Sequence, residues 1–148
     1  MDLIFHALTG FALKWKSRPW QAMLFSALPD ILGLGGLFNW LPYHYSHNIF
    51  AAVLITIITL ILHLPLELSG FYLLHIIIDI FAHNTGTGTL FFPFKDILNY
   101  TGTNWWQTPW IEITGYAILL VIIFIRYKKG EYQNNGNPTN NSHNFFGI

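Results

Sequence analysis

The sequence predicts an all-α fold, namely a polytopic membrane bundle of about five apolar helices with an irregular aromatic and Gly-rich loop before the last helix. The chain of 148 residues is 53% hydrophobic. Only 9% of it is charged, against roughly 25% in ordinary soluble domains. Its apolar residues also gather in runs of helical length. We expect a single helical membrane domain over residues 1–129 and a disordered, Asn-rich tail over 130–148.

Five apolar segments carry the predicted helices. The first ends in a basic stretch before Pro19, the second holds Pro29 and Asp30, and the third is the most uniformly apolar. The fourth contains the polar series described below, and the fifth ends in a second basic stretch. A full span needs about 20 residues, so the third and fifth are the safest spans, and the others are expected to be tilted, broken or shielded. The segments cover about 3–13, 20–38, 47–64, 66–82 and 111–127.

The loop over 84–110 joins the fourth and fifth segments. It begins with glycines and threonines and continues with phenylalanines and tryptophans. Such indoles are typical of an interfacial belt, or they line a substrate groove. The glycines are not followed by the Lys-Ser/Thr pair of a phosphate-binding loop.

The number and distribution of charged residues predict membrane lipid as the partner and predict how the chain is oriented in the membrane. Seven basic and seven acidic residues cancel, which gives no charge-based case for nucleic acid. Asp2 and His6 interrupt the start of the chain, so it does not resemble a secretory signal peptide. The basic stretches 14–18 and 126–129 are expected on the cytoplasmic side. With five crossings, the C-terminus then lies in the cytoplasm, and the expected location of the protein is the inner membrane of a bacterium.

The polar series in the fourth segment is the main candidate for chemistry. His75, Asp79 and His83 follow one another at four-residue intervals, so neighbouring members lie on one helix face about 6 Å apart along the axis. An unpaired Asp at the centre of a membrane helix costs on the order of 3 kcal/mol. Imidazoles beside a carboxylate suit a divalent cation, and with no cysteine in the chain the ligands must be nitrogen and oxygen.

Similar residues fall in the outer half of the other segments, so several helices can contribute to one centre. The cofactor expected is a divalent metal, zinc first and manganese second, as one ion or as two bridged by Asp79 or Asp30. A buried hydrogen-bond network is the alternative. Asp79, His83 and His44 are the candidates for a direct catalytic role, although His83 also suits a helix end and His44 a supporting or substrate role. The metal-ligand candidates are His6, Asp30, His47, His75, Asp79 and His83.

Other polar residues receive simpler interpretations. Ser46 is expected to cap the third segment, as serine does at helix starts. Glu67 and Glu112 lie near segment ends and are expected to be solvated, with Glu112 as a reserve general base. His63 is interpreted as structural, and His143 lies in the tail.

Taken together, these residues resemble the membrane-bound, metal-dependent hydrolase family, also described as LexA-binding, inner-membrane-associated hydrolases. The resemblance covers about residues 3–127, although Tyr43-His44-Tyr45 departs from a His-Arg-Gly stretch found in many members. It implies a metal-dependent hydrolase and supplies no substrate. The elements that carry it are, in order, His6, Pro29-Asp30, Ser46-His47-Asn48, His75-x-x-x-Asp79, Thr85-Gly86 and Phe92-Pro93-Phe94.

Three functions follow from these patterns. The first is an integral-membrane hydrolase that cleaves a phosphoester or ester of an amphipathic, lipid-like substrate with a metal-activated water. The second is an ion or proton carrier, which would need ionisable residues along the whole membrane thickness. The third is a structural membrane protein with a satisfied polar core.

Overall fold

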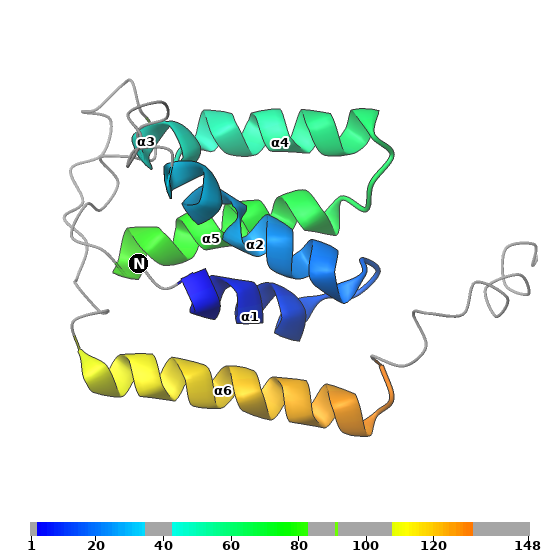
Figure 1. Ribbon diagram of the computed structural model, residues 1–148, viewed down its shortest axis with the longest axis vertical. Coiled ribbons are helices and arrows are strands. Elements are labelled where there is room, and N and C mark those ends of the chain that lie inside the picture. Colours follow the sequence, from blue (N-terminus) through cyan, green and yellow to red (C-terminus); the bar gives the residue numbers. More distant parts are fainter. Residues whose placement is uncertain (1–2, 35–42, 83–90, 92–107, 132–148) are drawn as a thin grey trace, which may run out of the picture.

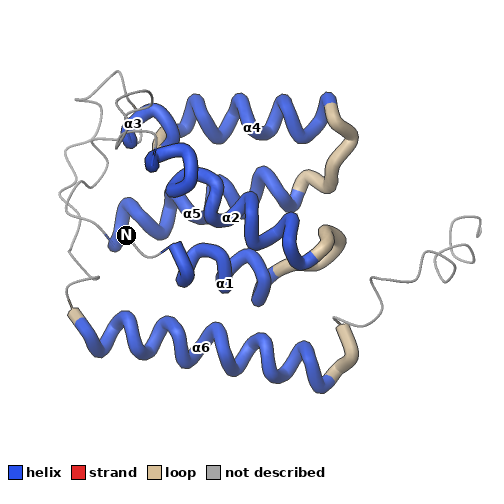
Figure 2. The backbone as a smooth tube through the Cα atoms, viewed as in Figure 1, coloured by secondary structure: helices blue, strands red, loops and turns tan. Residues whose placement is uncertain are grey.

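The computed structural model describes residues 3–34, 43–82, 91 and 108–131, and within these residues it contains helices and no strand (Figure 1, Figure 2). The all-α prediction is confirmed there, and the predicted tail over 130–148 lies outside the described residues from 132 onward. Five helices have eleven residues or more, and α3 is a single turn. The helices are α1 (Leu3–Leu13), α2 (Pro19–Gly33), α3 (Tyr43–Ser46), α4 (Ile49–Ile61), α5 (Glu67–Ala82) and α6 (Pro109–Lys128).

The longer helices run alternately up and down, and each packs on one or two others. α2 lies between α1 and α5, α4 packs on the far side of α5, and α6 contacts α1 (Figure 1). The α1–α2 turn, the α4–α5 turn and the end of α6 therefore lie at one end of the bundle, which we call the basic end (Figure 1). The start of α1, the turn after α3 and the end of α5 lie at the other end, which we call the polar end.

α1 and α2 approach each other closely at Gly10. A Cβ atom built on Gly10 would lie 2.2 Å from the carbonyl oxygen of Ala22 and 2.7 Å from Cβ of Ser26. Both distances are shorter than real Cβ contacts, so this crossing requires a residue without a side chain. Pro19 begins α2 at the first helical position, where its fixed φ suits the helix and its missing N–H costs nothing.

α5 is the centre of the core. Leu68 and Phe71 pack with Ala22 of α2, and Tyr72 and Ile76 pack with Ala52 of α4. One face of α5 is therefore buried along its whole length, and this face continues to the polar end.

Glu67 holds the start of α5 to the α1–α2 turn, which corrects the expectation that it is solvated. Its carboxylate accepts hydrogen bonds from the backbone N–H groups of Trp15 at 3.4 Å, Lys16 at 2.8 Å and Ser17. These three successive N–H groups can all face one carboxylate because they lie together in the α1–α2 turn. Glu67 therefore closes the basic end of the bundle.

The third segment is divided differently from the prediction. α3 ends at Ser46 and α4 begins at Ile49, because Asn48 is extended and its side chain accepts a hydrogen bond from the N–H group of Ala51 at 2.8 Å. Asn48 is thus the N-cap, and the expectation that Ser46 caps this helix is wrong.

α4 also ends earlier than expected. His63 has φ of 52° and follows the C-cap, and Leu64 donates to the carbonyl group of Thr59 in the manner of a Schellman motif. α4 therefore has 13 residues and a length of about 20 Å, too short for a hydrocarbon core of about 30 Å. The prediction of a full span over 47–64 does not hold.

α6 is the one helix of the described residues that could cross a membrane by length and composition. It has 20 residues and a mean hydropathy of 1.7, and 6% of that stretch is buried. Arg126 near its end donates to the carbonyl group of Ala12 at 2.6 Å, and Phe5 packs edge-on against Tyr116 with ring centroids 5.4 Å apart. These contacts attach α6 to α1.

Candidate metal centre

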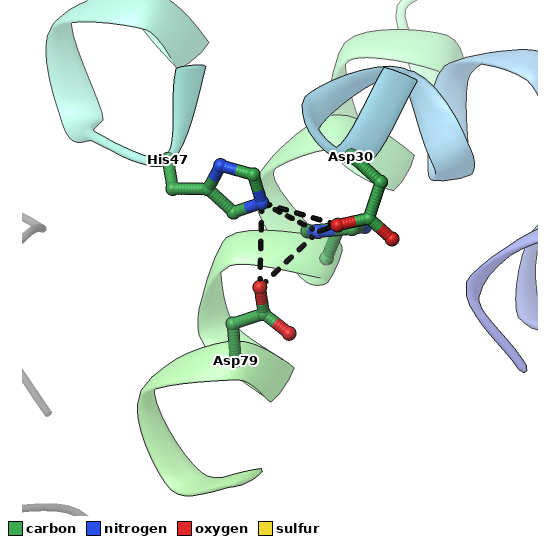
Figure 3. A group of neighbouring side chains, drawn as sticks. Asp30, His47 and Asp79 are labelled. Carbon is green, nitrogen blue, oxygen red and sulfur yellow. Dashed lines mark hydrogen bonds and ion pairs between the residues drawn. The ribbon is translucent and has the colours of Figure 1, made fainter. Parts of the chain in front are cut away.

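Four buried side chains from three parts of the chain meet at the polar end. Asp30 comes from the last turn of α2, His47 from the turn between α3 and α4, and His75 and Asp79 from successive turns of α5 (Figure 3). Asp30 and His75 are 0% exposed, His47 1% and Asp79 6%. One ligand atom from each lies within 4.8 Å of the other three. We call this set the four-ligand group.

Five of the six separations within the four-ligand group match those around a single ion, and the sixth, between carboxylate oxygens of Asp30 and Asp79, is within 4.8 Å. The two imidazole Nε2 atoms are 3.2 Å apart. Nε2 of His47 lies 3.3 Å from Oδ1 of Asp30 and 3.4 Å from Oδ2 of Asp79, and Nε2 of His75 lies 3.4 and 3.3 Å from the same atoms. Ligands held about 2.0–2.1 Å from a tetrahedral ion are roughly 3.3 Å apart. These atoms could therefore hold a divalent cation.

A hydrogen bond made by Nδ1 of His75 directs Nε2 of the same ring toward the other three ligands. Nδ1 of His75 lies 2.7 Å from the carbonyl oxygen of Ser26, and because a carbonyl only accepts, Nδ1 carries the proton. In the neutral ring Nε2 then bears the lone pair. That lone pair faces His47 and both carboxylates, as required of a metal ligand.

His47 is held by its neighbours in a similar way. The hydroxyl group of Ser46 lies 2.9 Å from Nδ1 of His47, and the hydroxyl group of Tyr72 donates to the carbonyl group of Ser46 at 2.6 Å. Tyr72 comes one turn before His75 on α5, so the same helix face supplies two ligands and anchors the turn that carries the third.

The charges of the group also suit a cation. Asp30 pairs with His47 and His75, and Asp79 pairs with His6, His47 and His75. Buried carboxylates need an opposite charge or full hydrogen bonding. A divalent ion would neutralise both carboxylates while the imidazoles remain neutral.

His6 lies beside the four-ligand group without belonging to it. Its Nε2 atom is 3.2 Å from Oδ1 of Asp79, the oxygen that does not face His47 and His75. Its ring stacks on that of His75, with centroids 3.6 Å apart and planes inclined by 29°. His6 therefore contacts the group through Asp79, and its role as a metal ligand stays a prediction.

The other residues singled out in the sequence do not belong to the four-ligand group, or their side chains lie outside the described residues. His44 lies in α3, but its side chain is outside the described residues, and so are His83 and His143. Glu112 lies in the first turn of α6 and is not part of the four-ligand group. His63 is exposed in the left-handed turn after α4, which agrees with a structural role.

Sequence reasoning missed the groups that orient the ligands. The carbonyl group of Ser26 carries no signal in a sequence, because every residue has one. Tyr72 could have been noticed, since it precedes His75 by three residues and shares its helix face.

Comparison of the chain with protein-family models, curated proteins and solved structures found no match.

Proposed function

We propose that this protein is an integral-membrane, metal-dependent hydrolase whose centre is the four-ligand group. The convergence of two imidazoles and two carboxylates from three separate parts of the chain carries the proposal. Zinc is the first choice of metal, because the separations of 3.2–3.4 Å fit a tetrahedral ion with nitrogen and oxygen ligands. Manganese is the second.

The residues around the centre have distinct roles in this proposal. A bound divalent ion would provide a nucleophilic water at neutral pH and polarise a phosphoryl or carbonyl oxygen. Asp30 and Asp79 neutralise the ion, and the hydrogen bonds to Ser26 and Ser46 fix the ring orientations of His75 and His47. Their burial keeps the surrounding dielectric low, which strengthens every charge interaction at the site.

The apolar surface supports a membrane location. α6 is long enough to cross, and α4 exposes a series of large apolar side chains. Such continuous apolar surface is typical of contact with lipid or a partner. The exposed apolar residues of α4 are Phe50, Val53, Leu54, Ile57, Ile58, Leu60 and Ile61.

The lengths of the other helices define the form of membrane association that we propose. α1, α2, α4 and α5 have 11, 15, 13 and 16 residues, fewer than the roughly 20 of a full span. α6 would therefore make the crossing, and the shorter helices would be embedded beside it. An amphipathic phosphoester or ester would reach the centre from the lipid phase.

A structural metal site is the second candidate function. One observation favours it, since four protein ligands are typical of closed structural sites, whereas catalytic sites keep a position for water. A carrier has less support, because the buried carboxylates and imidazoles of the described residues all belong to one cluster with His6 and form no path.

Turnover by the purified protein tests the proposal. We expect hydrolysis of phosphoester or ester substrates in detergent that a chelator abolishes and added metal restores. His75→Ala should lose this activity. His63→Asn is the matched control, because it removes an exposed histidine outside the cluster and asparagine tolerates the left-handed conformation. A metal-loaded protein without turnover that loses thermal stability on chelation would instead indicate a structural site.

A further inference from the structure

Each carboxylate of the four-ligand group has one oxygen turned away from it. Oδ2 of Asp79 faces His47 and His75, whereas Oδ1 faces His6. Oδ1 of Asp30 faces the same two imidazoles, whereas Oδ2 is buried and has no hydrogen-bond partner among the described residues. Figure 3 shows that both outer oxygens point away from His47. A buried carboxylate oxygen without a partner is costly unless something binds it.

The stacking of His6 on His75 gives a second, independent observation. Their Nε2 atoms lie 3.2 and 3.3 Å from the two different oxygens of Asp79. The ring centroids are 3.6 Å apart. Ions in two-metal hydrolytic sites are about 3.5–4 Å apart, so ions held by these two rings would have the spacing of such a pair.

From these contacts we infer a second cation site, made by Nε2 of His6, Oδ1 of Asp79 and Oδ2 of Asp30. Both carboxylates then bridge the two ions, and each of their four oxygens has a role. This inference rests on the proposed function, because the second ion is bridged to the first.

The second site offers the position for water that the four-ligand group lacks. A tetrahedral ion in the four-ligand group would have protein atoms at all four of its positions. The second site has three protein ligands, one imidazole and two carboxylates, and so keeps a position for water or for a substrate oxygen. The water that attacks the substrate would therefore be held at the His6 side of the centre.

Metal counting tests the inference. Wild-type protein is loaded with zinc in detergent, freed of excess metal and analysed for zinc per chain. We expect two ions in the wild type, one in His6→Phe and two in His63→Asn. Phenylalanine preserves the stacking on His75 but offers no ligand nitrogen, so the circular dichroism spectrum should stay close to that of the wild type. The unfolding temperature should fall, because Oδ1 of Asp79 loses its hydrogen bond to His6.

The outcomes separate this inference from the proposed function. One ion in the wild type, or two ions in His6→Phe, would overturn the second site and leave the first intact. No ion in the wild type would overturn both. If His6→Phe does not fold, the wild type loaded with manganese decides the question. A pair of ions at this distance gives an exchange-coupled paramagnetic resonance spectrum, whereas an isolated-ion spectrum would overturn the inference.

Discussion

The orientation of each imidazole of the four-ligand group depends on a residue outside the group. Ser46 is the clearest case, since its hydroxyl group lies 2.9 Å from Nδ1 of His47. Figure 3 shows that this ring nitrogen points away from Asp30 and Asp79. Without this contact the ring can rotate, and its basicity changes.

We predict that Ser46→Ala weakens metal affinity by about 10- to 100-fold, the usual effect of losing such a partner, while the fold is retained. Competition with a chelator of known affinity measures the change. Ser69→Ala is the matched control, because the Ser69 hydroxyl group donates to the carbonyl group of Leu66 and serves no ligand. Equal affinities in both variants would show that Ser46 does not support His47.

Glu67 gives a residue-level prediction for pH. Burial raises the pKa of Glu67, but hydrogen bonds from Ser17, Lys16 and Trp15 outweigh burial and bring its pKa below the ordinary value of 4.5. The charged form is thus favoured in the folded state. Its contribution to stability is complete above pH 4.5 and disappears as the pH falls through the lowered pKa.

We therefore expect Glu67→Gln to lower the unfolding temperature at neutral pH and to approach the wild type in acid. Unfolding in detergent across this range measures the difference, with Glu112→Gln as a control for loss of a negative charge elsewhere. Protonation of the metal ligands affects all three proteins alike and so cancels. A difference that persists unchanged in acid would show that the charge of Glu67 is not involved.

At the scale of helices, the contact at Gly10 determines how near α1 and α2 can lie. Gly10→Ala should destabilise the protein by about 1–3 kcal/mol, because the added methyl group would meet backbone atoms of α2. Gly70→Ala is the matched control, since a Cβ there meets nothing within 4 Å, and the change should be neutral or stabilising by about 0.5–1 kcal/mol. Denaturant unfolding of both variants checks this, and equal stabilities would mean that α1 and α2 are not in close contact.

The helices were largely predictable from the sequence, whereas their exact ends were not. The first segment was predicted at 3–13 and α1 covers Leu3–Leu13, since the Lys-rich stretch and Pro19 end it visibly. Hydropathy could not show that α4 stops before Leu62, because this end depends on the φ angle of His63 and not on polarity.

The candidate site was predictable in part for a similar reason. The four-residue spacing of His75 and Asp79 places both on one helix face, which the sequence alone establishes. That Asp30 and His47 lie opposite them depends on long-range packing of α2 and of the turn before α4, which no local pattern encodes. The role of Glu67 depends in the same way on contacts about 50 residues distant in sequence.

At the scale of the whole molecule, charge and polarity are separated along the bundle. Six of the seven basic residues of the chain lie in the two stretches at the basic end, at 14–18 and 126–129, whereas the four-ligand group lies at the polar end. This arrangement agrees with a cytoplasmic basic end and a centre in the outer half of the membrane.

Reporter fusions test this orientation. A fluorescent protein attached after Lys129 should be active in the cytoplasm, and a phosphatase reporter inserted at Gly102 should be active outside it. Fusions that report the same side would mean that α6 does not cross the membrane. Fusions with the two sides exchanged would reverse the proposed orientation.

The central claim is that imidazoles and carboxylates from separate helices bind one divalent cation, and X-ray absorption by the metal that copurifies with the protein tests it most directly. We predict a nitrogen and oxygen shell at about 2.0–2.1 Å, with outer-shell scattering from imidazole rings that falls in a His47→Ala, His75→Ala double variant. A protein that purifies folded but without metal, or a metal without imidazole scattering, would contradict the claim.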